Sequence, residues 1–241
     1  MKQIDIKNLE INKHIDYGSF SNVYSVTMDG KNYCYKKFKN CKIFGSEFFD
    51  KISSLSELYL LYSVLPKYFV KDNDEFGYLT DLYNHKDLGF AYSYSLKNKI
   101  LSLKFAKMAL VEIQQVGLIH GDIHFGNFLL RPSKLIDFDN CHYKAFNCNY
   151  SLLSTDAERF VNKFGMSKDL DIYLFNRMTF SLLNDKTNDI DTDLSIKNYG
   201  LFTSKDSIKI CKSLLLEEAT FNNCFLIDTV DLNDFQKRKL I

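Results

Sequence analysis

Apolar residues are spaced in two ways along this chain. In some stretches they alternate with polar residues or form short runs, which is typical of strands. Alternation around residues 33–36 predicts one strand, and apolar runs at 68–70 and 76–83, separated by a charged turn, predict two more. Two short apolar runs further on, at 128–130 and 134–136, predict a hairpin.

Elsewhere apolar residues recur every three or four positions, which indicates helices with one buried face. Leucines at this spacing predict a helix over 54–65, and a longer helix is predicted over 101–116. Similar stripes at 172–182 and 208–215 predict two further helices that face the core. The polar, aspartate-rich stretch 184–198 is expected to be an exposed connection between helices.

Composition narrows the classes of partner. The 241 residues include 31 Lys plus Arg and 30 Asp plus Glu, so the near-zero balance provides no overall field for nucleic acid or an anionic membrane. A short basic group at 237–239 is expected to be a solvated tail. No leader pattern and no membrane-spanning apolar stretch is evident. Six cysteines without metal-ligand spacing indicate thiols in a reducing compartment. A cytoplasmic location is therefore expected, with export as an effector left open.

The richest chemistry lies at 120–127, which reads His-Gly-Asp-Ile-His-Phe-Gly-Asn, and at 136–139, which reads Ile-Asp-Phe-Asp. Phosphoryl transfer needs a carboxylate near the acceptor hydroxyl, and oxygen ligands that hold magnesium against the nucleotide phosphates. Asp122, Asn127 and Asp137 are the right residue types in the right order. The alternative, in which these polar residues only cap turns, is weakened by further motifs upstream.

These motifs resemble the catalytic loop and the metal-binding triplet of the protein-kinase-like superfamily, His-x-Asp-x-x-x-x-Asn and Asp-Phe-Gly. The resemblance implies that Asp122 orients or deprotonates the acceptor hydroxyl, while Asn127 and Asp137 coordinate Mg²⁺. Gly121 and His124 stand where protein kinases usually carry Arg and Lys. The form His-Gly-Asp-x-His is seen in aminoglycoside and choline kinases and in some bacterial glycan kinases. We hypothesise that His124, in place of Lys, donates a hydrogen bond to the transferring phosphate.

Upstream, the stretch Ile-Asp-Tyr-Gly-Ser-Phe-Ser-Asn-Val-Tyr resembles the glycine-rich loop of the family. Gly18 matches the second glycine of the pattern and Val23 its valine, while Asp16 and Ser21 replace the outer glycines. Small residues let a backbone approach phosphates closely, so Gly18 and Ser21 fit and Asp16 is awkward. The residues that the resemblance assigns to the nucleotide here are Gly18, Ser19, Ser21 and Val23.

The strand Tyr-Cys-Tyr-Lys that ends at Lys36 resembles the strand that carries the nucleotide-binding lysine. Lys36 is therefore expected to pair with the phosphates, and a carboxylate from the next helix is expected to pair with Lys36. Glu57 is the first choice for that carboxylate, although it also fits a capping box that begins at Ser54. Glu47 is the alternative if the helix begins earlier.

Further roles are expected for the hinge, His120, Asp156 and Asp139. Asp81 to Tyr83 would be the hinge, with backbone groups available to the adenine edge. His120 is expected to be structural and to pack under the metal-binding strand, and Asp156 to anchor the backbone of the catalytic loop. Asp139 has two interpretations: it adds a second acidic group at the metal, or it caps the following turn.

The fold implied by the resemblance is α+β and bilobal, as in protein kinases. A small antiparallel sheet with one main helix would form an N-lobe over 1–80, residues 81–84 the hinge, and 85–241 a mainly helical C-lobe. The whole chain, 1–241, would be a single catalytic domain. ATP and Mg²⁺ are the implied cofactors.

The chain contains no Ala-Pro-Glu triplet, and the stretch from hinge to catalytic loop is too short for the helices with which aminoglycoside and choline kinases enclose a small substrate. An open acceptor surface favours a protein or glycan hydroxyl, and therefore a protein Ser/Thr kinase of an atypical compact type. The alternative is a small-molecule or glycan kinase of the aminoglycoside, choline or lipopolysaccharide-core type. A third hypothesis is a pseudokinase that only binds partners. A regulatory partner, and nucleotidyl transfer in place of phosphorylation, stay open.

Overall fold

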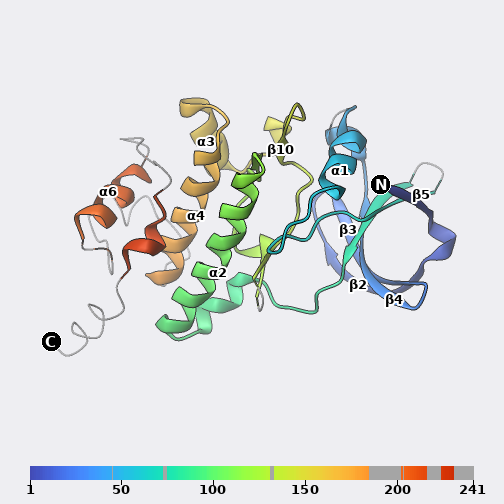
Figure 1. The fold of residues 1–241 in the computed structure, drawn as a ribbon, viewed down its shortest axis with the longest axis horizontal. Helices are drawn as coiled ribbons and strands as arrows, with labels where there is room; N and C mark the ends of the chain where they lie inside the picture. The colour runs from blue at the N-terminus through green and yellow to red at the C-terminus, as the bar shows by residue number, and fades with distance from the viewer. Residues whose placement is uncertain are drawn as a thin grey trace.

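A computed structural model describes residues 1–44, 46–72, 75–130, 133–184, 202, 204–215 and 224–230. It is an α+β structure, in which the strands of the main sheet gather at one end of the molecule and most of the helices at the other (Figure 1). Part of the predicted connection at 184–198, from residue 185 onward, and the basic group at 237–239 lie outside the described residues.

The main sheet has six strands in the order β1-β5-β6-β4-β3-β2. Its strands are β1 (Lys2–Asp5), β2 (Glu10–Tyr17), β3 (Ser21–Met28), β4 (Lys31–Phe38), β5 (Tyr68–Asp72) and β6 (Glu75–Asp81). Neighbouring strands are antiparallel, except that β1 runs parallel to β5. The strands predicted around 33–36, at 68–70 and at 76–83 are confirmed. The sheet is mixed, however, and not purely antiparallel as expected.

Strand β1 of the main sheet was not predicted from the sequence pattern. Within it Ile4 is buried and the residues on either side are exposed. A single buried residue gives no alternation to detect, so this strand is defined by its pairing with β5 and not by its own sequence.

The α-helices are α1 (Phe48–Ser56), α2 (Leu96–Gln115), α3 (Thr155–Phe164), α4 (Lys168–Leu183) and α6 (Lys205–Ser213). Short 3₁₀ turns lie between the elements: η1 (Ile6–Asn8), η2 (Cys41–Phe44), η3 (Leu88–Ser93), η4 (Phe125–Asn127), η5 (Tyr150–Leu152) and η6 (Leu226–Thr229). The helices predicted over 101–116, 172–182 and 208–215 correspond to α2, α4 and α6. The helix predicted over 54–65 is wrong, because α1 ends at Ser56.

In the irregular stretch after α1, the backbone forms its hydrogen bonds with other elements. The carboxylate of Glu112 on α2 accepts hydrogen bonds from the backbone N–H groups of Leu61 and Tyr62. The backbone of Leu135 bonds on both sides of Ser63, accepting from Val64 and donating to Tyr62. Helical spacing of the leucines is thus outweighed by these longer-range bonds, and the stretch joins the sheet part to the helical part.

The two faces of the main sheet are covered by different cores. On one face Phe38, Phe76 and Tyr78 pack with the helix α1 residues Phe48 and Ile52 as part of a core that continues into the helical part. The other face forms a smaller core with Ile4, Val26, Met28, Tyr33, Tyr35, Val70 and Leu79. Burial of both faces fixes the register of β4, which carries Lys36.

Two small antiparallel ladders position the loop at 120–127. Strand β7 (Leu118–Ile119) pairs with β10 (His142–Tyr143), and β8 (Phe128–Leu129) pairs with β9 (Lys134–Leu135). The second ladder confirms the predicted hairpin. Together the ladders bring the start of the loop, its end and the segment 136–140 to one place.

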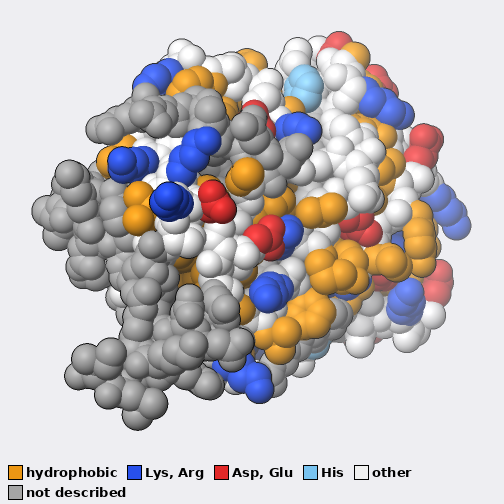
Figure 2. All heavy atoms as spheres, turned by 60° about the vertical axis from the view of Figure 1, so that its left-hand side comes forward, with side chains coloured by type: hydrophobic (Ala, Val, Ile, Leu, Met, Phe, Trp, Pro, Cys, Tyr) orange, Lys and Arg blue, Asp and Glu red, His pale blue; other side chains and the backbone are white. Residues whose placement is uncertain are grey.

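Figure 2 shows the molecule from the helical side. Basic and acidic side chains are interspersed on the described surface of that face, and apolar side chains form a band across it. This mixture agrees with a formal net charge of +1. Within the described ranges, the helices are too short or too polar to cross a membrane.

Candidate active site

A cleft of about 110 Å³ lies where the main sheet meets the helical part. Its walls are formed by the turn between β2 and β3, by strand β4, by the loop and segment that follow β7, and by η5. The lining residues are Gly18, Ser19, Phe20, Ser21, Lys36, His120, Asp122, Asp137, Asp139, Asn140 and Leu152. Half of the residues predicted for the nucleotide, for the metal and for catalysis thus line one cleft.

The turn between β2 and β3 covers one side of the cleft. The ammonium group of Lys39 donates a hydrogen bond to the backbone carbonyl of Gly18 at 2.8 Å, which holds the turn against β4. Val23 is the cross-strand partner of Lys36, so the turn is placed directly beside the lysine. Gly18 and Ser21 are close: a methyl group added at Gly18 would lie 3.2 Å from the carbonyl oxygen of Ser21. A side chain at Gly18 would therefore require Ser21 to shift by a few tenths of an ångström.

Lys36 pairs with two aspartates in the cleft. Its Nζ lies 2.5 Å from Oδ1 of Asp137 and also contacts Oδ2 of Asp139. Burial opposes the charge on Lys36, but the two carboxylates outweigh it and raise its pKa above the ordinary value. Desolvation likewise opposes the charge on Asp137, yet Lys36 lowers that pKa to about 2. For Asp139, burial dominates and raises the pKa to about 6.

The two aspartates differ in exposure and in backbone conformation. The side chain of Asp137 is 40% exposed, whereas that of Asp139 is 7% exposed and receives a second hydrogen bond from the hydroxyl of Tyr78. Asp137 has a φ of 69°, a left-handed conformation that is uncommon for residues other than glycine. Such strain is often found at functional sites. The oxygens of Asp139 contact Tyr78 and Lys36, which neither sequence interpretation expected, and a role at the metal stays a prediction.

The expected pairing of Lys36 with Glu57 or Glu47 is wrong. Glu57 is the exposed residue that ends α1, and Glu47 is the exposed residue before its start. Glu47 instead lines a separate cavity of about 430 Å³ at the beginning of α1. Because α1 ends earlier than predicted, the face that it turns to the sheet carries apolar residues and Lys51, and not Glu57.

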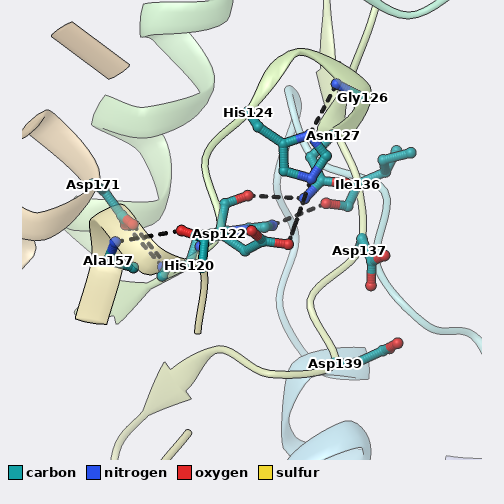
Figure 3. Close-up of polar contacts among 12 residues, drawn as sticks. His120, Asp122, His124, Gly126, Asn127, Ile136, Asp137, Asp139, Ala157 and Asp171 are labelled. Carbon is teal, nitrogen blue, oxygen red and sulfur yellow. Dashed lines mark hydrogen bonds and ion pairs between the residues drawn. The ribbon is translucent and has the colours of Figure 1, made fainter. Parts of the chain in front are cut away.

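Asp122, His124 and Asn127 form a connected group in the loop (Figure 3). The amide nitrogen of Asn127 donates to the backbone carbonyl of Asp122 at 2.8 Å and to its carboxylate at 3.1 Å. Nε2 of His124 lies 3.5 Å from the same carboxylate. Nδ1 of His124 accepts a hydrogen bond from the N–H of Gly126, so in the neutral ring the proton belongs on Nε2, facing Asp122.

The contact between Asp122 and His124 favours the charged form of both. Desolvation opposes ionisation of Asp122, but the bond to His124 outweighs it and lowers the pKa of the carboxyl. Desolvation also opposes the charge on His124, and the bond to Asp122 raises the pKa of the imidazole. Asp122 is therefore an ionised hydrogen-bond acceptor at neutral pH.

His120 has the structural role that was expected. It is buried, its Nε2 bonds to the backbone carbonyl of Ile136 at 2.9 Å, and its Nδ1 accepts a longer bond from the N–H of Asp122. Its ring packs edge-on against Phe138. His120 thus links the loop to the segment that carries Asp137.

The loop is anchored by Asp171 of α4, which the sequence analysis missed. Its carboxylate accepts hydrogen bonds from the backbone N–H groups of His120 and Gly121, both at 2.8 Å. Asp156, the predicted anchor, instead pairs with Arg177 and Arg159 near the start of α3. One feature of the sequence could have indicated Asp171. It is an acidic residue between Leu170 and Ile172, on a helix that is buried nearly all round.

The hinge residues do not line the cleft. The carboxylate of Asp81, at the end of β6, pairs with Lys67 at 2.5 Å and with Lys31 at 3.7 Å. Tyr83 lies under the ammonium group of Lys134, and desolvation raises the pKa of its hydroxyl. Backbone contacts of Asp81 and Tyr83 with a nucleotide base stay a prediction.

Asn127 and Asp137 fit a magnesium ion. The amide nitrogen of Asn127 is committed to Asp122, which leaves its carbonyl oxygen for a ligand. Asp137 is the more exposed aspartate and uses one oxygen on Lys36. Carboxylate and amide oxygens are ligands that magnesium accepts, usually together with water and substrate phosphates.

Two comparisons with known proteins found no match. The chain matches no protein-family model, and a search of curated proteins finds no similar sequence.

Proposed function

We propose that the protein is a phosphotransferase that uses ATP and Mg²⁺ and moves the γ-phosphate to a hydroxyl group. One observation carries the proposal: a single cleft brings together Lys36 of β4 with Asp122 and Asp137 from the loop and segment that follow β7. A cation, a metal-binding carboxylate and an acceptor-orienting carboxylate are the groups that phosphoryl transfer requires of a protein.

Each residue has a distinct part in the proposed reaction. Lys36 binds the nucleotide phosphates, and Asn127 with Asp137 would hold magnesium, which when bound neutralises phosphate charge. The acceptor oxygen bonds to the γ-phosphorus while the bond to the bridging oxygen of ADP breaks, and the hydroxyl proton leaves toward Asp122. Because its pKa is lowered, Asp122 is a weak base, and orienting the hydroxyl is its main contribution.

The finer fold assignment belongs to the same proposal. The main sheet and α1 lie on one side of the cleft, and α2 to α4 lie on the other (Figure 1). This division supports a bilobal, protein-kinase-like arrangement. In it residues 1–80 form the N-lobe, 81–84 the hinge and 85–241 the C-lobe. The short path from the end of β6 into η3 and α2 agrees with a brief connection between the lobes.

A protein hydroxyl is the acceptor that we favour. Between the proposed hinge and the loop at 120, the described chain forms η3 and α2 and has no inserted helices that could enclose a small substrate. The second candidate is a glycan or small-molecule hydroxyl. It is favoured by His124, whose ring contacts Asp122 in the place where protein kinases carry a lysine.

The test is transfer of label from γ-labelled ATP with Mg²⁺, in the presence of generic protein acceptors and a panel of aminosugars. Asp122→Asn should lower transfer about 10²-fold, because the acceptor hydroxyl loses the carboxylate that orients it. Asp50→Asn, an exposed change on α1, is the matched control and should leave transfer unchanged. Label on protein supports the first acceptor class and label on sugars the second. Binding of Mg-ATP without transfer to any acceptor would indicate a pseudokinase.

A further inference from the structure

We propose that Asp139 is the positioning residue that holds Lys36 in place for the nucleotide, in the role for which a carboxylate on α1 was expected. This inference rests on the proposed function. It assigns to Asp139 neither metal binding nor turn capping, and it makes the position of Lys36 independent of any acidic residue on α1.

The first argument is the geometry of the two strands behind the cleft. Lys36 on β4 and Tyr78 on β6 are direct cross-strand partners, so their side chains project from the same face of the sheet. Both reach the same carboxylate: Tyr78 donates to Oδ1 of Asp139 at 2.5 Å, and Lys36 contacts Oδ2. Asp139 is therefore fixed at two points by neighbouring strands, and Lys36 is fixed by it.

The second argument is the difference between the two aspartates. Both oxygens of Asp139 have donors and its side chain is 7% exposed, which leaves it poorly placed to bind an incoming ion. Asp137 is 40% exposed and contacts Lys36 through one oxygen. When Asp137 binds magnesium, Asp139 is the carboxylate that can keep its contact with Lys36.

The third argument is the residue that α1 turns toward this region. Lys51 is 2% exposed, and its ammonium group donates a hydrogen bond to the backbone carbonyl of Cys141 at 3.1 Å. Burial lowers the pKa of Lys51. Helix α1 thus presents an amine, and not a carboxylate, to the segment after Asp139. An amine cannot form an ion pair with Lys36, and the carboxylates that do so, Asp137 and Asp139, belong to the segment itself.

The experiment compares full-length wild type with Asp139→Asn, Tyr78→Phe, Asp137→Asn and Glu57→Gln. Titration calorimetry measures the Kd of Mg-ATP without any acceptor, and steady-state assays measure kcat, KM for ATP and the Mg²⁺ concentration for half-maximal rate. Thermal unfolding of each variant reports on folding. Glu57→Gln, an exposed change at the end of α1, is the control that removes the carboxylate first expected to pair with Lys36.

We expect Asp139→Asn to weaken Mg-ATP binding and to lower kcat/KM about 10–100-fold, as is usual when a residue that orients a ligand-binding group is lost. Its Mg²⁺ requirement should stay that of wild type, whereas Asp137→Asn should raise it. Tyr78→Phe should change the Kd in the same direction by a smaller factor, and it decides the question if Asp139→Asn does not fold. Glu57→Gln should match wild type.

Several results would overturn the inference. If Asp139→Asn binds Mg-ATP as wild type does, Asp139 does not position Lys36, and the proposed function survives. If Asp139→Asn raises the Mg²⁺ requirement as Asp137→Asn does, Asp139 is a metal ligand instead. If wild type itself does not bind Mg-ATP, the proposed function fails and the inference fails with it.

Discussion

The carboxylate of Asp171 on α4 accepts a hydrogen bond from the backbone N–H of Gly121 at 2.8 Å. Its other oxygen accepts from the neighbouring N–H of His120 at the same distance. Asp171 is fully buried, and burial raises the pKa of its carboxyl. A buried carboxylate with two backbone donors is a rigid support, and here it supports the loop that carries Asp122 (Figure 3).

Asp171→Asn should lower the free energy of unfolding by about 1–3 kcal/mol, because the amide offers one acceptor and leaves a buried N–H without a partner. Phosphotransfer should fall as well, since the loop loses its anchor. Chemical denaturation and the transfer assay measure the two effects. Asp169→Asn, in the same first turn of α4 and only partly buried, is the control and should change stability by a few tenths of a kcal/mol. Equal effects of the two substitutions would show that Asp171 does not anchor the loop.

Gly121→Ala should reduce both stability and transfer. Gly121 has a φ of 77°, a left-handed conformation in which an L-residue costs about 1–2 kcal/mol. Gly30 has a φ of 73° in the turn between β3 and β4, where an added methyl group would meet no other atom within 4 Å. Gly30→Ala is therefore a matched control for the backbone cost. We expect similar losses of unfolding free energy in both variants, and a loss of transfer in Gly121→Ala alone.

The sequence predicted those parts of the site whose functional residues lie within a recognisable local pattern. Alternation identified the strand of Lys36, and the order of Asp122, Asn127 and Asp137 identified the loop and the segment that follows it. These residues meet because short ladders on either side of the loop fix its ends. Asp122, Asn127 and Asp137 lie close together in the sequence, so their spacing was enough to detect them.

The sequence did not predict contacts that depend on long-range geometry. Helical spacing placed Glu57 on a helix, but the helix ends before the last three leucines of the stripe. The backbone that follows forms hydrogen bonds with Glu112 and Leu135 instead. Asp171 follows the loop by about fifty residues and carries no motif. Asp139 was recognised as acidic, but its contact with Tyr78 depends on the cross-strand register of β4 and β6.

Cys211 on α6 should be almost inert to iodoacetamide at pH 8, whereas the exposed Cys224 should react quickly. Burial raises the pKa of Cys211 from 9.0 to about 12, and the thiolate is the reactive form. Burial of the neutral thiol contributes to the stability of the folded protein. Because the pKa of the thiol is raised on folding, this contribution is complete below pH 9 and is lost as the pH rises toward 12. Mass spectrometry of labelled peptides, with and without denaturant, measures the reaction. Rapid labelling of native Cys211 would contradict the packing of α6.

His124→Ala should lower kcat about 10–100-fold and leave the Kd of Mg-ATP unchanged, because the ring contacts the acceptor-orienting carboxylate of Asp122 and lies outside the residues that line the cleft. Alanine also removes the bond from Gly126 to Nδ1, which by itself weakens the turn. His124→Asn separates the two causes, since asparagine can accept that bond but lacks Nε2. If asparagine restores kcat, the turn is what matters. If both variants keep the kcat of wild type, His124 has no part in the mechanism, and its contact with Asp122 is only structural.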